Sequence, residues 1–368
     1  MFDKRIKKLK ENLKKEKLDA VFISSVSNIS YLSGFTNFSK DEREAYIFVG
    51  QDFAYIITDG RYSEAVKIQV PHLKLFERSN GKSSEELFKK HKKEIKTLGI
   101  EEDNLTVLEH KVLKKHFKNL KHFNINNLRS IKNNEELGKI EKACKLGDLA
   151  FNFILKKIKV GVSEKEIAGE LEKFIKDKGA EFSFPAIVAF GRNSSVPHHQ
   201  TGNTKLKDGG TVLLDLGVKV DNYCSDMTRT IFFGKPSKEQ KEIYRIVLEA
   251  QQKAVEFLNK QISGASLRVK SDRRITGAEL DKVAREYIKL KGFPDIPHSL
   301  GHGIGLEIHE SPHLSPKSKE ELKMGMVFSI EPGIYIEGFG GVRIEDLYVL
   351  EKDGLKQLTT SSREIIKL

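Results

Sequence analysis

Two apolar segments of this sequence carry acidic residues where buried strands are expected, and this pattern constrains the fold more than any other feature. In residues 211–233, TVLLDLGVKVDNYCSDMTRTIFF, Asp215 lies inside one apolar run and Asp226 inside a second. The turn-forming pair Asp221-Asn222 lies between the two runs. The segment therefore predicts an antiparallel hairpin that carries two carboxylates.

The position of the turn fixes which residues of the hairpin face each other. With the centre between Val220 and Asp221, Asp215 is predicted to face Asp226, with Cβ atoms on the order of 5 Å apart. Two buried carboxylates at that distance repel each other unless they share a proton or hold a cation. This hairpin alone leaves both explanations open.

A second hairpin repeats the arrangement in residues 328–347, FSIEPGIYIEGFGGVRIEDL. With its centre at Gly338, in a glycine-rich turn, Glu331 is predicted to face Glu345. The simpler explanation for any one of these acids is the solvent-facing side of a half-buried strand. Two such hairpins in one chain favour a shared site of four carboxylates instead.

A histidine-rich stretch, HSLGHGIGLEIHESPH, could complete that site with His298, His302, His309 and His313. It lacks the H-E-x-x-H pattern of a zinc helix, but glycines on both sides of His302 allow a close approach. Four carboxylates and one imidazole balance two divalent cations, and this donor set suits Mn²⁺, Co²⁺, Fe²⁺ or Zn²⁺. Two such ions lower the pKa of a water and polarise a carbonyl, so the chemistry predicted is hydrolysis.

Length and composition exclude several classes of protein. A chain of 368 residues exceeds one ordinary core and predicts two domains. The net charge of +12 does not predict a nucleic-acid partner, because 52 acidic residues are interleaved with the basic ones. No apolar run approaches the roughly 18 residues of a membrane span, and the N-terminus lacks the apolar core of a signal peptide. We therefore expect a cytoplasmic protein without a membrane partner.

A polar segment divides the chain into two parts. Helical and strand-like runs alternate over residues 3–120 without a phosphate-binding glycine loop, and the polar residues 124–132 suit a linker. We predict an α/β (α+β) protein with domains at residues 1–130 and 131–368. Two later helices, at 237–261 and 277–291, are expected to be joined by a basic loop at 262–276.

The two hairpins and the histidine stretch resemble the pita-bread metallopeptidases, which include methionine aminopeptidase, aminopeptidase P and prolidase. The resemblance covers about residue 131 to the end, in the contexts LLDLG, SDMTRT, GHGIG, SIEPG and GVRIEDL. The N-terminal 130 residues, with NISYLSGF at 28–35, resemble the creatinase-type domain of the Xaa-Pro peptidases. The resemblance thus implies a creatinase-like N-terminal domain followed by a pita-bread catalytic domain.

The resemblance implies a role for each matching residue. Asp215 would bind one metal ion, and His302 with Glu331 would bind the other. Asp226 and Glu345 would bridge both ions. Glu331 would also move protons between the attacking water and the leaving amine.

The other matching residues would contact the substrate or support the ligands. His198, in VPHHQ, and His298 would contact the substrate, and His309 would hydrogen-bond the substrate carbonyl. Arg343 would be a partner of the ligand carboxylates and part of the substrate site. Two features depart from the family pattern: His199 follows His198, and the 262–276 loop is longer than usual and suggests a lid or dimer contact.

The implied activity is cleavage of Xaa-Pro bonds at the N-terminus of proline-containing peptides, by a homodimer that uses two divalent ions, with Mn²⁺ favoured. Within this class we favour an aminopeptidase P-like enzyme over an Xaa-Pro dipeptidase (prolidase). The alternative from another class is a non-catalytic pita-bread module that binds peptides or proteins; such relatives tend to lose metal ligands, and here all five are present. A creatinase-like C–N hydrolase would not need this carboxylate set.

Overall fold

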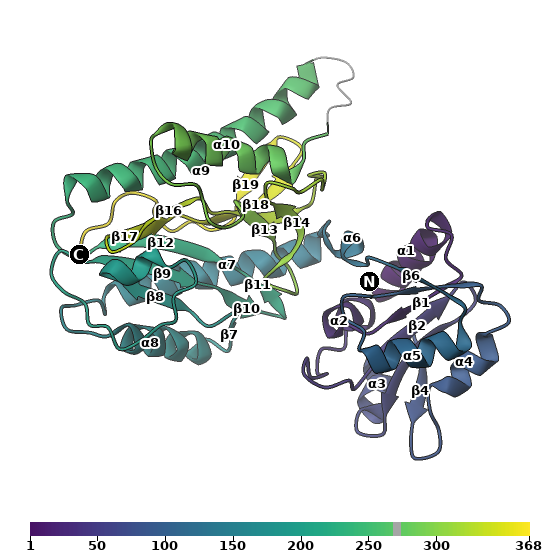
Figure 1. The fold of residues 1–368 in the computed structure, drawn as a ribbon. Coiled ribbons are helices and arrows are strands. Elements are labelled where there is room, and N and C mark those ends of the chain that lie inside the picture. Colours follow the sequence, from purple (N-terminus) through teal and green to yellow (C-terminus); the bar gives the residue numbers. More distant parts are fainter. Residues whose placement is uncertain (268–273) are drawn as a thin grey trace. The chain divides into compact units, whose positions relative to one another are not determined.

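The computed structural model describes residues 1–267 and 274–368, and the chain forms two compact units, Met1–Arg129 and Ser130–Leu368 (Figure 1). Both units combine helices with β-sheets, which agrees with the α/β (α+β) class expected from the sequence. Within the described residues, no helix combines the length and the apolar character needed to cross a membrane.

The first unit is built on one mixed sheet of six strands in the order β4-β3-β2-β1-β5-β6. The central pairs β1–β2 and β2–β3 are antiparallel, and the other three pairs are parallel. The strands are β1 (Ala20–Ile23), β2 (Tyr46–Gly50), β3 (Ala54–Asp59), β4 (Lys74–Arg78), β5 (Thr97–Ile100) and β6 (Asn119–His122). The helices are α1 (Phe2–Lys15), α2 (Val26–Ser33), α3 (Ser63–Gln69), α4 (Glu85–His91), α5 (Val107–His116) and α6 (Asn126–Arg129).

An aromatic cluster forms the core of this unit. Phe22 and Phe48 of the sheet meet Phe88 of α4 edge to face, with ring centroids 5.7 and 5.6 Å from it, and Phe117 packs behind them. Helix α6 lies inside the segment that the sequence suggested as a linker, because residues 126–129 form one helical turn there.

The second unit consists of two helix pairs with strands between them. Its first half contains α7 (Asn134–Leu155), α8 (Glu164–Asp177), β7 (Glu181–Phe182), β8 (Ile187–Phe190), the 3₁₀ turn η1 (Gly191–Ser195), β9 (Thr211–Leu216), β10 (Val218–Val220), β11 (Tyr223–Cys224) and β12 (Met227–Phe232). Its second half contains α9 (Lys238–Leu267), α10 (Gly277–Leu290), β13 (Gly301–Gly303), β14 (Glu310–Leu314), β15 (Val327–Ile330), β16 (Gly333–Ile336), β17 (Gly340–Arg343), β18 (Asp346–Glu351) and β19 (Gly354–Gln357).

The helices cover the strands from two sides (Figure 1). Helix α9 places a stripe of buried apolar residues, which includes Val247, Ala250 and Leu258, against Phe328 of β15 and Tyr348 of β18. Helices α7 and α8 pack in the same way on the sheet β12-β9-β8. The acid-bearing strands therefore lie in the interior, and the explanation by solvent-facing acids is wrong.

Helix α9 extends into the segment 262–276 that the sequence predicted as a loop. Helix α9 continues to Leu267, and Thr276 caps α10 in a capping box with Glu279. The remainder of that loop, residues 268–273, lies outside the described residues.

Candidate metal centre

The first acid-bearing hairpin has a different register from the one expected. The sequence predicted that Asp215 faces Asp226, but in the structure Asp215 pairs with Thr228. The reason is a two-residue turn: Asp221 and Asn222 both have positive φ, of 49° and 67°, so Val220 pairs with Tyr223.

The shift nevertheless keeps both acids on one face. It amounts to two residues, and side chains alternate with a period of two, so Asp226 stays on the same side of its chain as Thr228. Gly217 lies where the ladder breaks between β9 and β10, and a Cβ there would be 2.2 Å from the carbonyl oxygen of Ser225. This close approach brings Asp226, just before β12, toward Asp215.

The second hairpin has the register expected from the sequence. Ile330 pairs with Asp346 on one side of the acids and Gly333 pairs with Arg343 on the other, which places Glu331 and Glu345 between the two ladders. Thr228 joins the two hairpins, because its hydroxyl donates to Glu345 Oε2 at 2.7 Å and its carbonyl accepts from Glu345 N at 3.1 Å.

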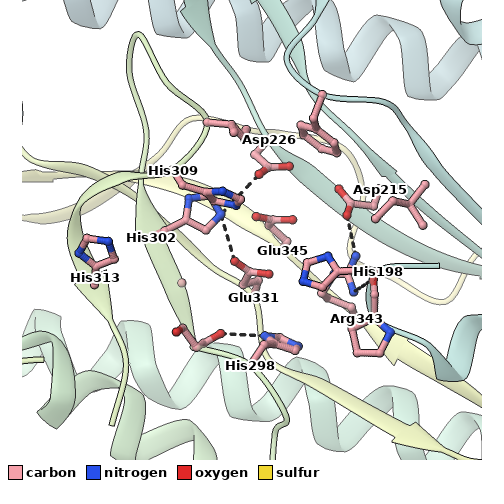
Figure 2. A pocket seen from close by; sticks show the side chains of 16 residues that line it. His198, Asp215, Asp226, His298, His302, His309, His313, Glu331, Arg343 and Glu345 are labelled. Atoms are coloured by element: carbon pink, nitrogen blue, oxygen red, sulfur yellow. Dashed lines mark hydrogen bonds and ion pairs between the residues drawn. The ribbon is translucent and has the colours of Figure 1, made fainter. Parts of the chain in front are cut away.

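His302 of β13 reaches the carboxylates from a third direction. Its Nδ1 lies 3.1 Å from the carbonyl oxygen of Gly303, to which it donates, so Nε2 is the ring nitrogen that faces the carboxylates. That Nε2 is 3.3 Å from Glu331 Oε1 and 3.6 Å from Asp226 Oδ2. Glycine is required beside it, because a Cβ on Gly301 would be 2.0 Å from the carbonyl oxygen of Ser329. Figure 2 shows the four acids and His302 around one shared space.

Mutual repulsion dominates the electrostatics of this space. Burial, and then the charges of Glu345 and Asp215, raise the pKa of Asp226 well above its ordinary value. Burial, and then the charges of Glu331 and Asp215, raise the pKa of Glu345 in the same way. The protein by itself therefore favours protons on these two carboxylates, and a cation would replace those protons.

Glu331 and His302 behave differently because they stabilise each other. Burial alone would raise the pKa of Glu331, but the hydrogen bond and the charge of His302 bring it down to about 2. Burial likewise opposes the charge on His302, yet the bond to Glu331 raises the pKa of this imidazole. Glu331 and His302 therefore favour each other's charge, whereas the acids around Asp226 and Glu345 oppose the ionisation of those two carboxyl groups.

The donor set fits a divalent metal ion. Asp215 Oδ1, Asp226 Oδ1 and Glu345 Oε1 are buried and accept no hydrogen bond within the described residues, although buried acceptors are nearly always satisfied. One ligand atom each of Asp226, His302 and Glu345 lies within 4.8 Å of the others. Carboxylate oxygens with one imidazole nitrogen are the ligands of Mn²⁺, Co²⁺, Fe²⁺ and Zn²⁺ sites.

A hydrogen-bonded chain supports the first hairpin from the side of the second. Arg343 Nη2 lies 2.6 Å from Asp215 Oδ2, and its Nη1 donates to the hydroxyl of Tyr335 at 2.9 Å. His298 donates from Nδ1 to the carbonyl oxygen of Ser299, so its Nε2 accepts from Tyr335 at 2.8 Å. Burial lowers the pKa of His298 and raises that of Tyr335 to about 12, which agrees with these proton positions.

The sequence analysis did not identify Tyr335 or Thr228. A signal for Tyr335 was present: Gly333 and Gly341 lie beside it in the hairpin, and a Cβ on either would be under 3 Å from the Tyr335 side chain. Thr228 gave no such signal, because a threonine inside a strand is ordinary and its contact with Glu345 joins distant parts of the chain.

The four acids open into a cavity of about 400 Å³. His302 and His309 meet there with ring centroids 4.4 Å apart, and burial followed by the charge of His302 lowers the pKa of His309. His313, one of the four histidines that the sequence offered to complete the site, also lines the cavity, and its Nδ1 lies 2.8 Å from Glu320 Oε1. The rest of the wall includes His198, His298, Arg343, Phe184, Ile187, Pro197 and Ile308.

Comparison with known proteins gives matches over nearly the whole chain. Residues 138–352 match the model of metallopeptidase family M24, and residues 5–131 match that of the creatinase/prolidase N-terminal domain. An Xaa-Pro dipeptidase of Pyrococcus furiosus is 38% identical, over 98% of this chain and 99% of its own length.

Two solved structures are similar along their full length. The Xaa-Pro dipeptidase from Bacillus anthracis has a TM-score of 0.88 and 35% identity, and covers 100% of both chains. The X-Pro aminopeptidase from Thermotoga maritima has a TM-score of 0.80 and 34% identity, over 96% of this chain and 98% of the other.

Proposed function

This chain belongs to metallopeptidase family M24, in its Xaa-Pro peptidase branch. We propose that it uses two divalent ions to hydrolyse the Xaa-Pro bond at the N-terminus of peptides. The observation that carries the proposal is the three buried carboxylate oxygens without a donor among the described residues, beside His302 Nε2. In this proposal Asp215 would hold one ion, His302 and Glu331 would hold the other, and Asp226 and Glu345 would contribute to both.

The residues around the ions have distinct tasks in the proposed reaction. When bound, two divalent ions supply a water of lowered pKa and polarise the substrate carbonyl. Glu331, with a pKa of about 2, is ionised at neutral pH and is the group that takes a proton and returns it to the leaving amine. His309 is neutral, because burial lowers its pKa, and donates one N–H to the carbonyl oxygen. His198 and His298 contact the peptide from the cavity wall.

The length of the peptide is a separate part of the proposal. Two full-length relatives carry the name Xaa-Pro dipeptidase, which favours dipeptides, whereas one is named X-Pro aminopeptidase, which favours longer peptides. The names thus move the leading candidate from the aminopeptidase favoured by the sequence to the dipeptidase. Hydrolysis of Ala-Pro and Ala-Pro-Ala by the same preparation separates the two, and a kcat/KM at least about tenfold higher for Ala-Pro supports the dipeptidase.

Metal reconstitution tests the reaction itself. Protein stripped with a chelator should bind two divalent ions per chain and gain Xaa-Pro hydrolysis, with Mn²⁺ as the proposed ion and Co²⁺, Zn²⁺ and Fe²⁺ as the comparison. Two bound ions with no hydrolysis of any Xaa-Pro peptide would contradict the proposal. Protein that binds no divalent ion would favour the non-catalytic binding module. Sedimentation of the same sample tests the proposed homodimer.

A further inference from the structure

His199 contacts Glu164, whereas its neighbour His198 lines the cavity. The two histidines are adjacent in VPHHQ, and only His198 is among the residues that line the cavity. His199 Nε2 lies 2.9 Å from Glu164 Oε2. Since a carboxylate only accepts hydrogen bonds, Nε2 is the donor.

Glu164 is a fully buried carboxylate that organises this loop. It is the first residue of α8, and its side chain is 0% exposed. Besides His199, it accepts from three other donors: Phe190 N at 2.8 Å, Asn193 Nδ2 at 2.8 Å and Gly202 N at 2.9 Å. An ionised carboxylate has about four acceptor positions, so Glu164 is satisfied by donors from β8, η1 and the loop that follows.

His198 is held from its other side by the metal centre. The carbonyl oxygen of Pro197 accepts from Arg343 Nη1 at 3.2 Å, and the same guanidinium contacts Asp215 at 2.6 Å. His199 N also donates to the carbonyl oxygen of Val196 at 3.1 Å, which closes a turn around His198. His198 is itself exposed, so its direction depends on these neighbours.

We propose that His199 is a positioning residue: its bond to Glu164 and the bond from Arg343 to Pro197 fix the segment between them, so that His198 meets the bound peptide. The inference rests on the proposed function, because it assigns His198 to the substrate. It predicts that His199 acts only through His198 and not through the metal ions.

Kinetics of variants test the inference in two backgrounds. His199→Phe keeps the ring but removes the donor, and should raise KM for Ala-Pro about tenfold with two bound ions and kcat within about twofold. His199→Gln restores a donor and should recover most of the loss. In a His198→Ala background, His199→Phe should change KM by less than about twofold. An equal loss in both backgrounds would overturn the inference.

A matched control and a second readout separate this inference from the proposed function. His116→Phe removes a similar bond, 2.7 Å to Glu85, at a residue that does not line the cavity, and should leave KM unchanged. Hydrogen exchange of residues 196–202 should be faster in His199→Phe but not in His116→Phe. If exchange is unchanged in an active enzyme, the positioning role of the His199–Glu164 bond is overturned, but the proposed function is not. If the wild-type protein is inert on Xaa-Pro peptides, the proposed function is overturned, and the role of His198 with it.

Discussion

Glu101 in the first unit and Asp226 in the second are equally buried carboxylates with opposite surroundings. They are 3% and 4% exposed, and burial is the first cause that raises the pKa of each. Glu101 accepts from Ser24 N at 2.5 Å and Ser25 N at 2.8 Å on one oxygen, and from the Asn28 side chain on the other. Asp226 Oδ1 accepts no hydrogen bond from the described residues.

The difference shows what distinguishes a structural acid from a candidate metal ligand. Burial and the direction of the pKa shift are the same for both residues, so neither separates them. The separating property is whether the protein supplies the donors. Glu101 follows β5 and meets the backbone N–H groups that precede α2, whereas Asp226 meets other carboxylates and His302.

The strongest way to break this comparison is to neutralise each acid. Asp226→Asn should lower metal affinity and Xaa-Pro hydrolysis by more than about 100-fold. Loss of a residue that only hydrogen-bonds a metal ligand already lowers metal affinity or activity by about 10–100-fold. Glu101→Gln should leave two ions bound per chain. Metal content by mass spectrometry and initial rates measure both, and normal metal content in Asp226→Asn would remove this residue from the ligand set.

The same two variants should shift the stability of the metal-free protein in opposite directions. A carboxyl group whose pKa is raised by folding makes the fold less stable as the pH rises above its unfolded pKa, so Asp226→Asn should increase the free energy of unfolding at pH 7 by about 1–3 kcal/mol. Folding raises the pKa of Glu101 too, but Glu101→Gln also breaks bonds from Ser24, Ser25 or Asn28. We expect this loss to dominate and to decrease the free energy of unfolding by about 1–2 kcal/mol. Urea denaturation measures both; a decrease for both variants would show that Asp226 is a structural acid as well.

Tyr335 extends the comparison within the second unit. It is not one of the proposed metal ligands, but it hydrogen-bonds His298 and Arg343 at the site. Tyr335→Phe removes the donor to His298 and an acceptor of Arg343, so activity should fall about tenfold while two ions stay bound. Phenylalanine keeps the ring that fits between Gly333 and Gly341. A loss of metal as large as that of Asp226→Asn would place Tyr335 with the ligands instead.

The smallest expected effect concerns Glu109 in the first unit, where hydrogen-bond donors lower the pKa of the carboxyl group by more than burial raises it. Burial would raise its pKa, but bonds from Arg43, Tyr46 and Thr106 lower it from 4.5 to about 2. Because the folded pKa lies below the unfolded one, the stabilisation is complete above about pH 4.5 and is lost as the pH falls toward about 2.

Glu109→Gln should therefore cost less than about 1 kcal/mol at pH 7, since the side chain of its partner Arg43 is 31% exposed to solvent, and nothing near pH 2. Urea denaturation followed by circular dichroism at pH 7 and pH 3 compares the variant with wild type. A cost that grows as the pH falls would contradict the assigned sign.

The sequence by itself determined the acids, the histidine and the register of the second hairpin. Gly338 has a φ of 77°, a conformation that favours glycine, so the local sequence fixed that turn and with it the position of Glu331 relative to Glu345. The first hairpin was placed two residues away from its true register, because Asp221 and Asn222 both adopt positive φ and the letters do not show which pair is central.

The tertiary structure alone decided how these parts meet. The Thr228–Glu345 bond and the approach of Tyr335 to His298 join residues far apart in the sequence, and the Glu164–His199 bond joins a helix start to a loop. Periodicity tells which face of an element is buried, but the partner of a buried polar group depends on how separate elements pack. The acids were therefore readable from the chain, whereas their lack of donors among the described residues became visible only once the helices had closed over the strands.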